Sequence, residues 1–160
     1  MEVKMKHVYK QSVDVVFKAF GSKAVLEKKY AAVGARNVSV ESCKLTKTAL
    51  DLKFTREIPL NAPSMLKKFL GEWNTTTQEE HWTGTPGKKY ESEMTVSFKG
   101  VPASIKGTMV LTGDAKGCTN IVTLTVASGI PLIGKKLAEF VGETAAGEGQ
   151  KEYEYLKANP

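Results

Sequence analysis

The sequence predicts an α+β fold in which a curved antiparallel sheet of about six to seven strands wraps around one long C-terminal helix. Residues 36–128 mainly alternate between apolar and polar side chains, which is typical of strands with one buried face. Beyond Pro131, apolar residues recur at the spacing of a helix with one apolar face. Such a helix must cover another element, and the short turns between the strands favour an antiparallel sheet as its partner.

The first part of the chain is expected to form a strand and two short helices. Residues 3–10 alternate in character. The inward face of this strand carries Val3, Met5, His7 and Tyr9. Ser12 and Ser22 are suitable N-cap residues for one helix that ends at residue 20 and for another over residues 23–33. Two short helices in direct succession predict a V-shaped connector.

A hairpin and an inserted helix follow. Residues 37–46 and 50–55 are expected to form two strands joined by a tight turn. Residues 64–70 predict a short amphipathic helix that ends at Gly71. Its apolar residues are Met65, Leu66, Phe69 and Leu70. A helix between two strands is unusual in a plain meander, so this insert is a distinctive feature of the chain.

Four further strands are expected, over residues 73–83, 90–98, 105–111 and 121–127. The clearest alternation places on one face Tyr90, Ser92, Met94, Val96 and Phe98. In the strand 73–83, neither face is clearly apolar or clearly polar. Trp73 and Trp82 differ in parity, so they cannot both point inward without a β-bulge, and the pattern leaves open which of them does.

The terminal helix combines an apolar face with several glycines. Pro131 suits its first turn, where the missing N–H has no helical partner anyway. The inward face is expected to carry Leu132, Ile133, Leu137, Phe140, Val141, Thr144 and Ala145. Gly142, Gly147 and Gly149 are unexpected there, since a glycine costs about 1 kcal/mol relative to alanine inside a helix. Glycines that face the sheet would leave space for a pocket, whereas glycines that face solvent would only weaken the helix.

The composition indicates one domain over residues 1–160. No apolar run approaches the roughly 18 residues of a membrane helix. The alternating N-terminus is not a secretory signal, so a cytoplasmic protein is expected. The net charge is +6, but the lysines are scattered and there are only two arginines, which argues against nucleic-acid binding. A solvated surface or weak attraction to anionic membranes accounts for the charge.

The predicted order of elements resembles the helix-grip fold of the START-like superfamily, also called SRPBCC, which includes START lipid-transfer domains and Bet v 1-like plant proteins. The resemblance extends from Val3 to about Leu156. The insert 58–71, followed by a strand that ends in Glu80-His81-Trp82, is similar to a bacterial START-like family of unknown function with a short helix between the third and fourth strands. The resemblance implies a deep apolar cavity between the sheet and the terminal helix, and it supplies no catalytic residues.

The sequence has no strong catalytic motif, no metal-ligand spacing and no cofactor-binding motif, so no metal and no cofactor are expected. His7, Tyr90 and His81 are weak candidates for acid–base catalysis. The alternative for His7 is a buried core histidine. The alternative for His81 is a solvated strand face, so the sequence leaves an enzymatic role uncertain and favours a non-catalytic one.

Inward-facing aromatic and methionine side chains indicate a site for a hydrophobic ligand, although they are also typical of an ordinary core. Arg56 continues the inward phase of its strand and can either bind a ligand carboxylate or pair with a structural glutamate. The predicted ligand-binding residues are His7, Tyr9, Phe54, Arg56, Met65, Phe69, Trp73, Tyr90, Ser92, Met94, Phe98, Met109, Leu137, Phe140 and Val141.

The insert 63–71 is a candidate lid that touches a ligand or, transiently, an anionic membrane, with Lys67 and Lys68 at its rim. Packing against the sheet edge is the alternative.

The preferred function is binding or carriage of a hydrophobic small molecule, lipid-like or polycyclic. The alternatives are a cyclase- or hydratase-type enzyme that uses the same cavity and an interaction or stress adaptor with a filled core. The sequence indicates neither the ligand nor the oligomeric state.

Overall fold

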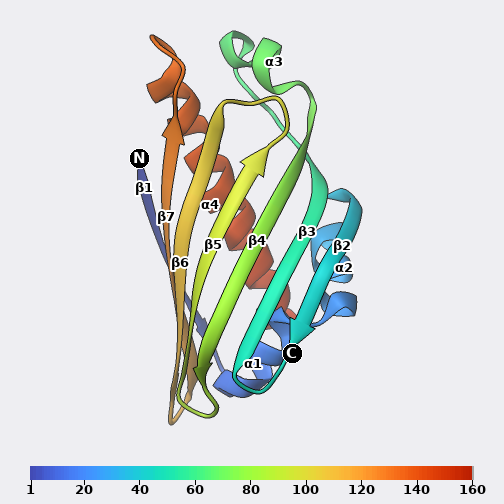
Figure 1. Ribbon diagram of the computed structural model, residues 1–160, viewed down its shortest axis with the longest axis vertical. Coiled ribbons are helices and arrows are strands. Elements are labelled where there is room, and N and C mark those ends of the chain that lie inside the picture. The colour runs from blue at the N-terminus through green and yellow to red at the C-terminus, as the bar shows by residue number, and fades with distance from the viewer. Residues whose placement is uncertain (160) are drawn as a thin grey trace.

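The computed structural model describes residues 1–159, and Pro160, the last residue of the predicted domain, lies outside the described residues. Figure 1 shows the arrangement of its helices and strands. In chain order these are β1 (Glu2–Tyr9), α1 (Val13–Phe20), α2 (Lys23–Ala32), β2 (Arg36–Leu45), β3 (Ala49–Pro59), α3 (Ser64–Leu70), β4 (Trp73–Thr85), β5 (Lys89–Phe98), β6 (Ala103–Asp114), β7 (Gly117–Ser128) and α4 (Gly134–Ala158).

The seven strands form one antiparallel sheet in the order β1-β7-β6-β5-β4-β3-β2. The long helix α4 runs behind this curved sheet, α1 lies near one end, α2 lies beside β2, and α3 projects at the opposite end (Figure 1). The α+β prediction of a curved sheet around a C-terminal helix is confirmed. No helix in residues 1–159 has both the length and the apolar character needed to cross a membrane.

The short helices begin and end where the sequence predicts, because the local chemistry is satisfied. The hydroxyl groups of Ser12 and Ser22 accept hydrogen bonds from the N–H groups of Val15 and Val25, both at 3.3 Å, as N-caps do. Gly71 follows α3 with a φ of 69°, a left-handed conformation that favours glycine. The cap geometry therefore fixes the boundaries of α1 and α2 at their N-termini and of α3 at its C-terminus.

The orientation of the two tryptophans in β4 follows from its pairing with β3. The ladder between residues 49–59 and 73–83 has no register shift, so the alternation of sides continues unbroken. Trp82 is 1 % exposed and faces the interior, whereas Trp73 is 38 % exposed. The question that the sequence left open is thus answered without a β-bulge.

The start of the terminal helix differs from the prediction. The helix begins at Gly134, and residues 131–133 form a turn. Leu132 has a φ of 70° and is fully exposed, so its expected inward position is wrong. A positive φ interrupts the helical path, and the inward face is set only after this interruption. From there on, the predicted inward residues Leu137 and Val141 are buried.

The three helix glycines have different surroundings. A Cβ atom on Gly142 would lie 2.7 Å from Sδ of Met1, and one on Gly149 would lie 3.0 Å from Sδ of Met5, so both glycines allow α4 to approach β1. A Cβ on Gly147 would meet no atom within 4 Å. The hypothesis of a pocket-forming glycine face is therefore wrong for Gly147, which is exposed, and only Gly149 lines the cavity described below.

Replacing Gly147 with alanine is expected to raise the free energy of unfolding by about 0.5–1 kcal/mol, because alanine is the better helix former and the site has room for its methyl group. Urea denaturation measures this change. The matched variant Gly149→Ala should gain less, because its methyl group must displace Met5. Equal gains at the two positions would contradict the assigned helix orientation.

Candidate ligand-binding cavity

A cavity separates the concave face of the sheet from α4. Its volume is about 140 Å³, counted as the space open to the centre of a water molecule, against the roughly 10–15 Å³ that one water needs. Its wall includes residues of both hydrophobic clusters of the core, one beside α1 and α2 and the other beneath the N-terminal half of α4. The interior between sheet and helix is therefore incompletely filled.

The cavity wall is mainly apolar and brings together eight of the predicted ligand-binding residues. They come from four strands and from α4, although they are far apart in the sequence. These eight are His7, Tyr9, Arg56, Met94, Phe98, Met109, Phe140 and Val141. Their position is thus established, while their part in binding a ligand stays a prediction.

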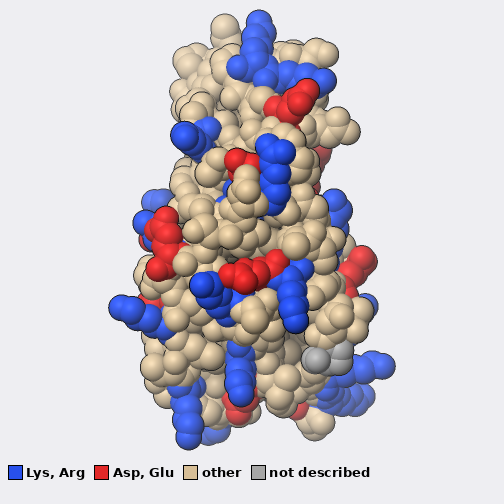
Figure 2. Space-filling view, turned by 90° about the vertical axis from the view of Figure 1, so that its right-hand side faces the viewer, with Lys and Arg blue, Asp and Glu red and all other residues tan. Residues whose placement is uncertain are grey.

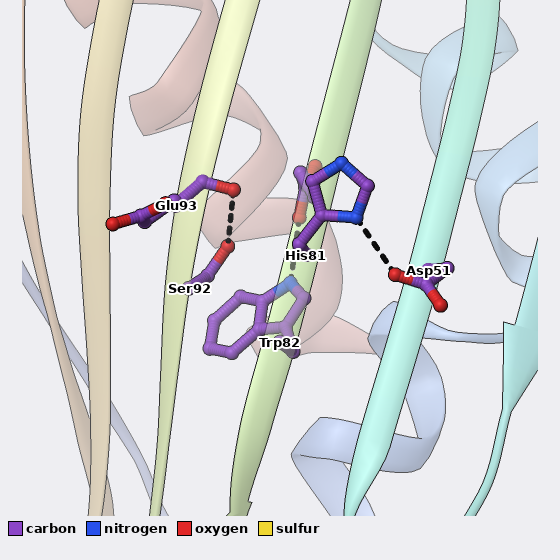
Figure 3. A network of polar contacts seen from close by, with 6 residues as sticks. Asp51, His81, Trp82, Ser92 and Glu93 are labelled. Atoms are coloured by element: carbon purple, nitrogen blue, oxygen red, sulfur yellow. Dashed lines mark hydrogen bonds and ion pairs between the residues drawn. The ribbon is translucent and has the colours of Figure 1, made fainter.

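Four predicted residues point inward but lie outside the cavity. Phe54 and Leu137 are completely buried in the core. Ser92 donates a hydrogen bond to the carbonyl oxygen of Glu93 at 3.2 Å (Figure 3). Tyr90 stacks on Phe17, with ring centroids 3.7 Å apart. For the three strand residues the reason is that alternation identifies the side of the sheet but not which inward positions border the cavity, and helical spacing has the same limit for Leu137.

Tyr90 has a structural role that the sequence did not suggest. Its hydroxyl group donates a hydrogen bond to Oδ1 of Asp14 at 2.7 Å and so joins β5 to α1. Burial, together with this bond and the negative charge of Asp14, raises the pKa of Tyr90 to about 12. Tyr90 is therefore not placed to transfer a proton to a molecule in the cavity.

The other three predicted residues outside the cavity are exposed. Met65 and Phe69 lie on the outer side of α3, with 45 and 41 % of their surface exposed. Trp73 packs against the guanidinium of Arg36, 3.8 Å from its ring centroid. The insert nevertheless borders the cavity, because Leu70 at the end of α3 forms part of the wall.

His81 lies on the face of the sheet opposite to α4. Figure 3 shows its ring pointing toward Asp51 on the neighbouring strand, and Nδ1 lies 2.7 Å from Oδ1 of that residue. Both side chains are more than half exposed. The solvated strand face that the sequence offered as the alternative is thus the actual position, and His81 cannot reach a molecule in the cavity.

Several polar residues of the wall were missed by the sequence reasoning. Glu80 is buried, and its carboxylate accepts hydrogen bonds from Nε2 of Gln78 at 2.6 Å and from Nε1 of Trp82 at 2.9 Å. These three side chains are two residues apart on one strand and therefore lie on the same face. An inward Trp82 would thus have predicted that Gln78 and Glu80 also point inward. Glu148 and Glu152 could likewise have been found, because they continue the helical spacing of the inward residues of α4.

His7 forms part of the wall on β1 and is 6 % exposed. Its ring stacks on Tyr153 of α4, with centroids 4.5 Å apart and planes 7° apart. Burial lowers the pKa of His7, and the nearby carboxylate of Glu152 opposes this effect. His7 is directly paired across the strands with Asn120 of β7, which is also buried and also lines the cavity.

Arg56 forms part of the opposite wall, on β3. Its guanidinium lies 4.5 Å from the ring centroid of Tyr30 and 5.1 Å from that of Phe54. None of the ion pairs within residues 1–159 includes Arg56, so the structural glutamate partner considered as an alternative is not found there. A buried guanidinium is thus held by aromatic faces beside an apolar cavity.

The burial of His7 predicts a pH dependence of stability. The unfolded chain has a histidine pKa of 6.5, and the folded chain has a lower one. Below pH 6.5 the unfolded state therefore binds a proton that the folded state lacks, and the free energy of unfolding falls as the pH falls. In urea denaturation, His7→Gln should lose less stability than wild type over this range. Parallel pH profiles for wild type and His7→Gln, or a change as large for His81→Gln, would contradict the assignment.

Comparison with solved structures shows the same fold at low sequence identity. TTHA0849 from Thermus thermophilus is 16 % identical, with a TM-score of 0.62 and full coverage of both chains. Protein Ms6760 from Mycobacterium smegmatis is 11 % identical, with a TM-score of 0.61, and the alignment covers 98 % of this chain and 88 % of that one. The Bet v 1-like Ara h 8.0201 is 9 % identical, with a TM-score of 0.62 and 99 % of each chain covered.

Sequence comparison identifies the family. No curated protein matches the chain in sequence. Residues 4–158 match the family described as protein of unknown function (DUF2505), which is nearly the whole chain. The protein therefore belongs to the DUF2505 family.

Proposed function

We propose that the protein binds or carries a hydrophobic small molecule, lipid-like or polycyclic, in the cavity between the sheet and α4. The observation that supports this function is the cavity itself, which is mainly apolar and has a few polar groups in its wall. The resemblance of the fold to START-like proteins points in the same direction. A cavity of this volume also argues against the adaptor with a filled core.

Burial of the ligand provides the driving force. Apolar surface removed from water contributes roughly 25 cal/mol per Å², so a ligand that buries about 200 Å² gains on the order of 5 kcal/mol before the costs of association are subtracted. The few polar groups of the wall would then orient the ligand. This mechanism requires no chemical step.

Of the three acid–base candidates for the enzyme alternative, only His7 lines the cavity. Tyr90 and His81, the other acid–base candidates, lie away from the cavity. Burial lowers the pKa of His7, so its imidazole is neutral at neutral pH and has the protonation state of a general base. A substrate turned over by wild type but only bound by His7→Ala would support this alternative.

Two adjacent alanines of α4 provide a matched test of the binding function. Ala145 lines the cavity and Ala146 does not, although both are half-buried. N-phenylnaphthylamine, an uncharged apolar probe that fluoresces when it leaves water, should bind the wild type and Ala146→Leu. Its affinity for Ala145→Leu should be lower by about ten-fold, because the added side chain occupies the cavity. No binding to wild type, or equal binding to the two variants, would overturn the proposal.

The exposed side of α3 supports a second proposal, transient contact with an anionic membrane. Met65 and Phe69 expose large apolar side chains on either side of the exposed Lys67 and Lys68. The turn over residues 131–133, just before α4, lies at the same end of the molecule (Figure 1), and its Leu132 is fully exposed. Figure 2 shows basic side chains at this end, whose charge complements that of anionic lipids. Loading from a membrane would bring a ligand close to Leu70, which lines the cavity.

Cosedimentation with vesicles tests this contact. The protein should bind vesicles of phosphatidylcholine mixed with phosphatidylglycerol and should not bind phosphatidylcholine alone. Replacing Met65 and Phe69 with serine should abolish binding, whereas Val15→Ser, an equally exposed apolar position on α1, should have no effect. Binding that is unchanged in the double variant would exclude this surface.

A further inference from the structure

Three polar atoms of side chains in the cavity wall have no hydrogen-bond partner among residues 1–159. They are Nε2 of His7, Nη1 of Arg56 and Oδ1 of Asn120. The three residues are 6, 7 and 3 % exposed, so each is more than nine-tenths buried. Buried polar atoms are almost always paired in folded proteins, and three exceptions around one apolar cavity indicate partners from a ligand.

We propose that the ligand is an uncharged apolar molecule with a carbonyl oxygen that accepts from Arg56 and a hydroxyl group that binds His7 and Asn120. This inference rests on the proposed function and specifies the class of molecule. Sheet order places the two polar positions on different walls, because Arg56 lies on β3, whereas His7 and Asn120 lie on β1 and β7. The ligand oxygens are therefore expected at separate positions on an apolar body.

The charges of the wall favour a neutral acceptor for Arg56. The cavity is lined by two basic residues, Lys29 and Arg56, and by three acidic ones, Glu80, Glu148 and Glu152. These carboxylates offset the positive charge through space, but none forms an ion pair with Arg56. A ligand carboxylate would add a fourth negative group, whereas a carbonyl oxygen accepts the unpaired N–H without adding charge.

The contacts that hold Arg56 leave its N–H donors available to a ligand. Its guanidinium lies near the faces of Tyr30 and Phe54, and these contacts use none of its N–H donors. Since Nη1 is covered by the surrounding wall, the guanidinium must turn toward the cavity when a ligand binds. The terminal bonds of an arginine side chain allow such a rotation.

A hydroxyl group matches the other two unpaired atoms. His7 and Asn120 face each other across β1 and β7, and a hydroxyl can donate to one of them while it accepts from the other. Because the unpaired amide atom of Asn120 is the acceptor Oδ1, this arrangement requires the imidazole tautomer with its proton on Nε2, so that the hydroxyl accepts from His7 and donates to Asn120. Both atoms are covered by the surrounding wall, so these side chains, like Arg56, must turn toward the cavity, where one ligand hydroxyl would satisfy both at once.

A series of compounds with the same two-ring body separates these contributions. Diphenylmethane has no oxygen, benzophenone adds the carbonyl, para-hydroxybenzophenone adds the hydroxyl, and para-benzoylbenzoate adds a charge. Displacement of N-phenylnaphthylamine gives their dissociation constants. In wild type we expect benzophenone to bind about ten-fold more tightly than diphenylmethane, and the hydroxylated compound to bind more tightly still. Para-benzoylbenzoate should bind more weakly than benzophenone.

Substitutions show which residue produces each gain in affinity. Arg56→Met should bind benzophenone and diphenylmethane alike, and Arg56→Lys, which keeps a charged donor, should retain part of the difference. Asn120→Leu and His7→Phe should remove the gain from the hydroxyl group, and His7→Phe keeps a ring to stack on Tyr153. Thermal unfolding of each variant shows whether it is folded.

The possible results are distinguishable. If N-phenylnaphthylamine does not bind, the proposed function itself fails. If the probe binds but benzophenone and diphenylmethane bind equally to wild type, water pairs with the three atoms and the ligand class is wrong. Tighter binding of para-benzoylbenzoate than of benzophenone would replace the neutral ligand with an acid and would also overturn the inference.

Discussion

Asn120→Leu is expected to raise the free energy of unfolding by about 1–3 kcal/mol. Asn120 is 3 % exposed, and its Oδ1 atom has no partner in the described chain. Leucine has nearly the same shape, adds apolar contacts beside the cavity and removes the desolvation penalty of an unpaired amide. Urea denaturation of the two proteins without added ligand measures the change. An amide kept in the wall at the expense of stability indicates a role in binding.

Asn74 is the matched control for this prediction. It is 5 % exposed and also faces the interior, but its amide group donates to the carbonyl oxygen of Lys99 at 3.1 Å. Asn74→Leu should therefore lower the free energy of unfolding by about 1–3 kcal/mol, because it removes the buried amide and its hydrogen bond to that partly buried carbonyl oxygen. A loss of stability in both variants would show that Asn120 is paired in the folded protein, and the inference about the ligand would lose its basis.

Trp82→Ala is expected to lower the free energy of unfolding by about 3–5 kcal/mol. Trp82 is 1 % exposed, and its ring packs against Phe17 and Phe20, with centroid distances of 5.9 and 5.5 Å. Its indole N–H is also one of the two donors to the buried carboxylate of Glu80. The substitution therefore creates a cavity and weakens the pairing of a buried charge.

Two variants show which part of this effect comes from packing. Trp82→Phe keeps most of the ring but removes the donor to Glu80, so it should lose less stability than Trp82→Ala. Trp73→Ala, on the same strand with the opposite orientation, should cost only about 0.5–1 kcal/mol, since it removes a partly exposed contact with Arg36. Equal losses for Trp73→Ala and Trp82→Ala would contradict the assigned faces of β4.

The sequence allowed the fold to be predicted because its periodicity and turn signals agree along the whole chain. The boundaries of α3 were predicted to the residue, since Gly71 ends the helix. Leu132 was misplaced because a positive φ before the helix depends on the path of the loop, and apolar spacing does not report it. The spacing of apolar residues shows which side of a helix or strand is buried, whereas the path of the backbone determines at which residue that element begins.

The site was predictable only in part. Alternation correctly placed His7, Arg56 and Met109 in the cavity wall, but it could not distinguish the wall from core positions such as Phe54. Asn120 shares the parity of its apolar neighbours on β7, but it was missed because the strand was predicted to begin at residue 121, whereas β7 begins at Gly117. Only packing in three dimensions shows which inward residues are covered by helices.

A crystal structure of the complex with para-hydroxybenzophenone tests the central claim most directly. We predict that the compound lies between the sheet and α4, in contact with Met109 and Phe140, with its carbonyl oxygen at Arg56 and its hydroxyl group between His7 and Asn120. A compound bound only at the outer surface, with nothing but water in the cavity, would contradict the proposed function.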